Sequence, residues 1–122
     1  MRREQRLRRS AEFALVQHKG RWWSNPLLVL RALPNNREDA RFGFLVSKRV
    51  GNAVMRNRVR RRLREIVRRE PVAAGWDLVF IARTKIAEAP FADIERATRE
   101  LLGRGQVYYP PPQAARPQGD ER

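Results

Sequence analysis

The sequence predicts a single α+β domain, a mixed α/β sandwich in which helices pack on a four-stranded sheet. Helical and strand-like hydrophobic patterns follow one another along the chain, with turn signals between them. A length of 122 residues allows one hydrophobic core but not two. Hydrophobic residues make up 42% of the chain, which is enough for a folded protein. The expected order is a helix, two or three strands, a basic helix, a strand and a final helix.

The chain begins with a basic segment and a short helix. Residues 1–9 carry five arginines and are expected to form a basic N-terminal arm. The helix that follows is expected to start at the N-cap Ser10 and to end at Gly20. Phe13 and Val16 fall on its apolar face.

The next segment is predicted to be extended. Residues 21–33 read as strand structure that Pro26 interrupts, and the Pro-Asn-Asn sequence at 34–36 is a turn signal. Residues 41–47 alternate between two faces, which indicates a further strand. One face of that strand consists of Phe42, Phe44 and Val46.

A second helix and a buried strand follow. Residues 54–69 have helical spacing, and Pro71 lies just beyond their end. Residues 76–82 are nearly all apolar, as expected for a strand covered on both faces. The apolar face of the helix is formed by Met55, Val59, Leu63, Ile66 and Val67.

The last helix is expected to open at Pro90 and to end at Gly103. Residues 106–122 are rich in proline and contain little that could pack, which indicates a disordered tail. The folded domain is therefore expected to span residues 10–105. The core face of the last helix consists of Phe91, Ile94, Thr98 and Leu101.

The charge of the chain indicates a polyanionic partner. Lys and Arg total 27 against 13 Asp and Glu, which gives a net charge of +14. Such a surface repels itself and favours a partner of opposite sign. The domain at 10–105 is accordingly expected to bind nucleic acid, with an anionic membrane surface as the alternative.

The charge is concentrated in residues 41–69, which contain eleven basic residues and a single acid, Glu65. Like charges four residues apart weaken a helix, so folding gives no reason for this pattern. A nucleic-acid backbone would neutralise it; the alternative is a solvated surface helix, although such helices usually mix signs. One expected stripe, opposite the apolar face, comprises Asn57, Arg61, Arg64 and Arg68, and a second beside it comprises Arg58, Arg62 and Arg69.

The loop at 48–52 leads into this basic helix. Gly51 permits a backbone conformation that other residues resist. Asn52 is suited to cap the helix, whose free N–H groups would themselves favour a phosphate. The alternative is that Gly51 and Asn52 are simple turn residues.

No catalytic or metal-binding residues are expected. The chain has no cysteine, which excludes disulfides, zinc ribbons and thiol catalysis. His18 is the single histidine and lacks an obvious orienting partner, and the acids are scattered apart from the pair at 38–39. No segment reaches the roughly 20 apolar residues of a membrane span, and no apolar run of a signal peptide follows the basic start. A cytoplasmic location is expected.

Residues 47–58 read SKRVGNAVMRNR. This run closely resembles the signature of the bacterial ribonuclease P protein component, in which a strand ending in Ser-Lys-Lys/Arg leads into Gly-Asn-Ala-Val-x-Arg-Asn-Arg and a basic helix. The resemblance extends over residues 6–103, and includes the spacing of Leu7 and Phe13 and the Ile-Ala-Arg sequence at 81–83. It does not cover the proline-rich tail.

The resemblance implies a more detailed fold. The element order would be α-β-β-β-α-β-α, as in domain 2 of ribosomal protein S5. The strands at 41–47 and 76–82 would be parallel and joined through the helix at 54–69 by a left-handed crossover. That hand is rare, because about 98% of such connections are right-handed.

The resemblance also implies a function. The family is the protein partner of a catalytic RNA that removes the 5′ leader from precursor tRNA; the RNA performs the hydrolysis and holds most of the magnesium, so the protein itself needs no cofactor. Neither DNA nor a membrane is an expected partner. Residues implied to bind the catalytic RNA are Lys48, Arg49, Asn52, Arg56, Asn57, Arg58, Arg61, Arg62, Arg64 and Arg68. Residues implied to line or border the leader cleft, between the first helix and the sheet, are Phe13, Gln17, Ser47, Lys48 and Arg83.

Several alternatives remain open. Phe13 can be a core residue as well as a leader contact, and Gln17 stands where many relatives have a second aromatic. Trp22 and Trp23 could both offer stacking surfaces, but one of two adjacent strand residues must face inward. A ribosomal or RNA-chaperone protein would share the charge and size, whereas a duplex-DNA binder would need a recognition helix that this order of elements does not provide.

Overall fold

The computed structural model describes residues 2–110, so the expected disorder of residues 111–122 lies outside the described part of the chain. A short 3₁₀ turn, η1 (Arg3–Gln5), precedes the first helix. The elements that follow are α1 (Ser10–Lys19), β1 (Arg21–Ser24), β2 (Leu28–Pro34), β3 (Arg41–Leu45), α2 (Ala53–Val67), β4 (Trp76–Ala82), the 3₁₀ turn η2 (Thr84–Glu88) and α3 (Phe91–Gly105). The order α-β-β-β-α-β-α is therefore confirmed.

The four strands form one sheet in the order β1-β2-β4-β3. Strand β2 pairs antiparallel with both β1 and β4, whereas β3 and β4 are parallel. The pairing places Trp22, Arg31, Val79 and Gly43 in one row across the sheet. Each row exposes its side chains on a single face, because neighbouring strands in register share the same pleat.

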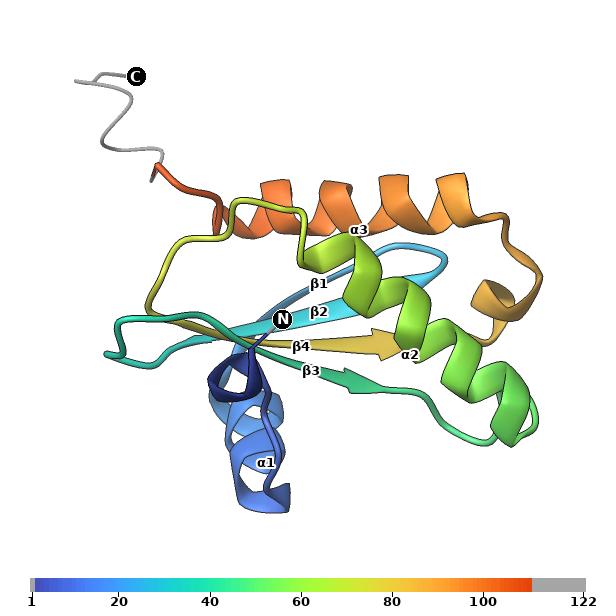
Figure 1. Ribbon diagram of the computed structural model, residues 1–122, viewed down its shortest axis with the longest axis horizontal. Coiled ribbons are helices and arrows are strands. Elements are labelled where there is room, and N and C mark those ends of the chain that lie inside the picture. The colour runs from blue at the N-terminus through green and yellow to red at the C-terminus, as the bar shows by residue number, and fades with distance from the viewer. Residues whose placement is uncertain (1, 111–122) are drawn as a thin grey trace.

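The connection from β3 through α2 to β4 has the rare hand. In Figure 1 both strands run from left to right, β4 lies above β3, and α2 crosses in front of them. When the sheet is viewed from the side of α2 with both strands pointing up, β4 lies to the left of β3. The crossover is therefore left-handed. This agrees with the fold that the resemblance implied.

Helices cover both faces of the sheet (Figure 1). Helices α2 and α3 lie on one face over the larger core, and α1 lies on the other face. Strand β4 serves both layers, because Leu78 and Phe80 belong to the larger core while Val79 belongs to the smaller core under α1. The prediction that the strand at 76–82 is covered on both faces is confirmed.

Helix α1 is fixed across the sheet by an apolar contact and an ion-pair bridge. Val16 is 0% exposed and packs with Val79. The guanidinium of Arg41, on β3, donates to Glu12 of α1 at 2.9 Å and to Asp77 of β4 at 2.8 Å. The backbone N–H groups of the two residues before α1, and then Arg41, hold the pKa of Glu12 below its usual value. These contacts tie α1 to the edge strand β3 and to its neighbour β4.

Helix ends differ from the sequence prediction in all three helices, and α2 ends at Val67, two residues before the predicted end. The N-cap of α1 is Arg9, not Ser10, and Glu12 accepts its backbone N–H at 3.1 Å. The carboxylate three residues into the helix therefore does the capping that the Ser10 hydroxyl was expected to do. Helix α3 continues through Gly103 to Gly105 and ends at Gln106, which has a φ of 56°.

The folded domain is longer at both ends than the range 10–105. The N–H of Leu7 donates to the carbonyl of Phe42 at 2.9 Å, so the N-terminal segment lies along the outer edge of β3. The prediction that residues 106–110 belong to the tail is wrong, because Val107 is 0% exposed and Tyr108 forms a β-bridge with Val72. Within residues 2–110, no helix has the length and apolar character needed to cross a bilayer.

Candidate nucleic-acid interface

The start of α2 is formed as the sequence predicted. The side chain of Asn52 accepts a hydrogen bond from the N–H of Met55 at 2.9 Å, which confirms Asn52 as the N-cap. The backbone at Gly51 is close to fully extended (φ 159°), and a Cβ there would lie 2.9 Å from Cγ of Met55. Gly51 is therefore required by the close approach of the helix. The strand before this loop ends at Leu45, two residues earlier than predicted, because a turn closes between Ser47 and Val50.

The basic side chains at this end of the molecule lack acidic partners. Elsewhere in the described chain, arginines form ion pairs, for example Arg37 with Asp39 at 2.9 Å and Arg99 with Glu70 at 3.0 Å. No basic residue between 48 and 64 forms an ion pair within residues 2–110. We call this set the unpaired basic surface; it comprises Lys48, Arg49, Arg56, Arg58, Arg60, Arg61, Arg62 and Arg64.

Members of this surface differ in how freely they can reach a ligand. Lys48, Arg49, Arg58 and Arg61 are exposed. Arg56 is half-buried and donates to the carbonyl of Gly51 at 3.3 Å, which steadies the loop. At the far end of α2, Arg68 pairs with Glu65 at 3.2 Å, so its charge is already partly neutralised.

One end of the unpaired basic surface lies at the edge of β3, where Arg64 contacts the strand. Arg64 lies over the ring of Phe44, with its guanidinium carbon 5.8 Å from the ring centroid. Its Nε is buried and has no hydrogen-bond partner in the described chain. Burial foremost, and then the charges of Arg6 and Arg60, lower the pKa of Arg64. An anion bound here would offset both the desolvation and the repulsion.

The sequence pattern identified Arg64 but neither Arg6 nor Arg60, which lie beside it. Arg64 was placed on a stripe opposite the apolar face, but it bends toward β3 and borders a pocket of about 120 Å³ with Arg6 and Arg60. Arg60 is one turn before Arg64, so helical spacing could have identified it. Arg6 could not have been identified, because it reaches the pocket only through the pairing of its segment with β3.

Phe13 lies on the other face of the sheet, under the edge strand. A Cβ on Gly43 would lie 2.3 Å from Cε1 of Phe13, so the ring rests directly on the glycine backbone. Phe13 is half-buried and packs against the smaller core, which gives it a structural role and still leaves part of the ring accessible. Gln17 follows one turn later on α1 and is exposed.

The remaining predicted leader contacts lie at one end of the sheet. Because β3 and β4 are parallel, Ser47 and Arg83 both follow the carboxyl ends of their strands. The Ser47 hydroxyl accepts the N–H of Arg49 at 3.3 Å, and Arg83 donates to the carbonyl of Asn25 at 3.3 Å. Lys48 is exposed beside them. The predicted leader contacts thus come from α1 and from one end of the sheet.

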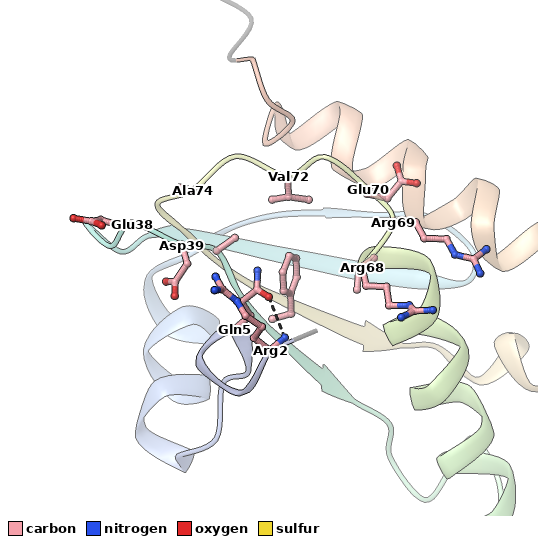
Figure 2. Close-up of a pocket in the computed structure, with 12 residues that line it drawn as sticks. Arg2, Gln5, Glu38, Asp39, Arg68, Arg69, Glu70, Val72 and Ala74 are labelled. Carbon is pink, nitrogen blue, oxygen red and sulfur yellow. Dashed lines mark hydrogen bonds between the residues drawn. The ribbon is translucent and has the colours of Figure 1, made fainter.

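A larger hollow of about 570 Å³ has a different character (Figure 2). It lies between η1, the loop at Glu38 and Asp39, and the end of α2. Both arginines and carboxylates line it, as Figure 2 shows for Arg2, Asp39, Arg69 and Glu70. This mixture of signs suits a polyanion less well than the unpaired basic surface does. Within the described range, no group of three or more His, Cys, Asp or Glu side chains is placed to hold a metal ion.

The chain matches proteins of one family by sequence and by structure. The family model for ribonuclease P matches residues 1–106. The ribonuclease P protein component of Dehalococcoides mccartyi strain CBDB1 is 45% identical over 107 residues, covering 88% of this chain and 89% of the relative. That of Roseiflexus castenholzii is 46% identical over 110 residues, covering 88% and 90%.

Solved structures agree with the sequence relatives. The ribonuclease P protein of Staphylococcus aureus superposes with a TM-score of 0.79 at 29% identity, covering 85% of this chain and 97% of that one. The protein from Thermotoga maritima superposes with a TM-score of 0.75 at 31% identity, covering 81% and 96%. The chain therefore belongs to the ribonuclease P protein component family, as a subunit of the ribonucleoprotein that processes the 5′ end of tRNA.

Proposed function

We propose that this protein assists cleavage by the RNA of ribonuclease P in the cytoplasm by binding two RNA strands on separate surfaces. The unpaired basic surface binds the phosphates of the catalytic RNA. Phe13 and Gln17 on α1, together with the sheet end at Ser47, Lys48 and Arg83, bind the 5′ leader of precursor tRNA. DNA is not a partner in this proposal.

The observation that carries the proposal is the absence of acidic partners along the unpaired basic surface. Eight basic side chains between residues 48 and 64 have no ion pair in the described chain, while arginines at six other positions do. Uncompensated like charges on one surface repel one another and are stabilised by a polyanion.

We further propose that the protein contributes no catalytic group. Hydrolysis of a phosphodiester requires a general base or carboxylates that hold metal ions. Most carboxylates near the middle of the chain are engaged with arginines; Asp77, for example, accepts two hydrogen bonds from Arg41 and one from Asn35. The magnesium ions of the reaction are then held mainly by RNA phosphates.

The leader surface is tested with the Phe13→Ala variant. Loss of one ring on which a base stacks is expected to reduce the preference for precursor over mature tRNA on the order of tenfold. Assembly with the catalytic RNA should change much less, because the unpaired basic surface is on other elements and meets Phe13 only at the small pocket beside Arg60 and Arg64. The measurement is the affinity of the assembled holoenzyme for both tRNA forms.

A folding control accompanies this variant, because Phe13 also packs on the smaller core. Circular dichroism and denaturant unfolding identify a loss of stability, and Gln17→Phe supplies a second test that removes no core contact. Gln17→Phe should hold or improve the preference for precursor. Unchanged preference in a folded Phe13→Ala variant would contradict the leader assignment.

A further inference from the structure

Trp22 is an exposed aromatic side chain on the α1 face of the sheet. It is 60% exposed, although it lies within β1. The next residue, Trp23, points to the opposite face, where it packs against the larger core and lies under the guanidinium of Arg21. The two tryptophans that the sequence could not distinguish therefore have different roles, and core packing explains only Trp23.

Trp22 and Phe13 mark the two ends of one row across the sheet. Trp22 pairs with Arg31, which pairs with Val79, which pairs with Gly43, the residue under Phe13. Three strand spacings of about 4.8 Å separate the ends, or about 14 Å in total. Helix α1 follows the same direction, because Phe13 lies at β3, Val16 at β4, and Gly20 beside β2.

The neighbouring row is only partly covered and contains no acid. Toward the carboxyl ends of β3 and β4 it consists of Ser24, Val29, Ile81 and Leu45, none of which is fully buried. Arg83 and Lys85 border this end of the sheet, beside a hollow of about 450 Å³ that also includes Ser24. An uncharged floor with a basic border suits single-stranded RNA, whose bases stack on apolar groups while its phosphates meet cations.

Arg31, which pairs with Trp22 on the neighbouring strand, also favours RNA binding at this position. Arg31 has a buried Nε without a hydrogen-bond partner in the described chain, and its Nη2 lies 3.4 Å from the carbonyl of Gly20. This guanidinium places a positive charge next to the exposed indole, so a cation and a stacking surface are available to the same nucleotide.

We propose that Trp22 is a stacking platform for a base of the 5′ leader, farther toward the 5′ end than the base at Phe13. The proposal rests on the proposed function and adds a second contact at the opposite edge of the sheet. The direction follows from the position of the unpaired basic surface, which begins in the loop after β3. The cleavage site near the catalytic RNA is then at the β3 end, and β1 is the strand farthest from it.

The test compares substrates that differ only in the leader. One precursor carries a leader too short to extend beyond Phe13, a second carries a leader several nucleotides longer, and mature tRNA carries none. Holoenzymes are assembled with wild-type protein and with the Trp22→Ala, Trp22→Leu and Trp22→Phe variants. Tyr109→Ala is the matched control, since Tyr109 is 68% exposed and lies away from this face.

Trp22→Ala and Trp22→Leu should weaken binding of the long-leader precursor on the order of tenfold, with little change for the other two substrates. Trp22→Phe should restore most of the loss, because a phenyl ring also stacks. A leader-dependent quenching of tryptophan fluorescence should be present in the wild type and reduced in Trp22→Phe.

Three outcomes would overturn the proposal. Equal binding of the long leader by wild type and Trp22→Ala excludes stacking at this position. Equal weakening for all three tRNAs indicates a contact with the tRNA body or a folding defect. If the Trp22→Leu holoenzyme binds the long-leader precursor as tightly as the wild type does, an apolar side chain is sufficient and the aromatic ring is not required. A wild-type holoenzyme that does not distinguish precursor from mature tRNA at all would instead remove the proposed function, and this inference with it.

Discussion

The affinity of this protein for the ribonuclease P RNA is expected to fall roughly a thousandfold between about 50 and 200 mM monovalent salt, if on the order of six phosphates are engaged. The physical reason is the release of counterions from RNA when cations replace them. The unpaired basic surface offers eight such cations. Filter binding or fluorescence anisotropy over a salt series measures the slope directly.

Single substitutions test whether the unpaired basic surface causes this salt dependence. Arg61→Gln should lower the slope by about one unit and leave sequence preference unchanged. Arg37→Gln is the matched control, because Arg37 already pairs with Asp39 at the other end of β3. A flat salt response of the wild type would mean that stacking or base recognition dominates binding.

Simultaneous replacement of Arg56 and Arg58 by alanine is expected to weaken assembly with the catalytic RNA strongly. Each lost charged contact is worth about 1–3 kcal/mol, so the pair should cost at least tenfold in affinity. Arg58 is exposed on α2, and its side chain has no hydrogen bond or ion pair within residues 2–110. Arg56 adds a contact that steadies the loop before α2.

The control for this pair removes two arginines whose charges are already neutralised. Arg37→Ala combined with Arg96→Ala lowers the net charge equally, but Arg37 and Arg96 each pair with an aspartate. Denaturant unfolding of both double variants shows whether the loss of the Arg56 contact to Gly51 affects stability. If the two double variants bind RNA with equal affinity, only the net charge of the protein matters, and the assignment of the interface to Arg56 and Arg58 is wrong.

Much of the fold could be predicted from hydrophobic spacing. The strand at 76–82 has the predicted bounds, because a continuous apolar run between Gly75 and Arg83 leaves little choice of ends. The error at Gly103 has a physical reason: the C-cap position is taken by Gln106, so the helix continues two residues beyond Gly103 before Val107 enters the core. Such a contact depends on tertiary packing and cannot be read from local pattern.

The site could be predicted where its residues are close in sequence. The cap by Asn52 and the exposure of Arg58 and Arg61 follow from the motif and the helical spacing. The approach of Arg6 to Arg64 depends on pairing between segments far apart in the chain. The orientation of Trp22 likewise depends on strand register, which adjacent aromatic residues do not reveal.

The most direct test of the central claim is cleavage of precursor tRNA by a bacterial ribonuclease P RNA at low magnesium, with and without this protein. We predict that the protein restores accurate removal of the 5′ leader under conditions in which the RNA alone is nearly inactive, and that the protein alone cleaves nothing. Cleavage by the protein alone, or binding to the catalytic RNA and precursor no tighter than to unrelated RNA of equal length, would contradict the account.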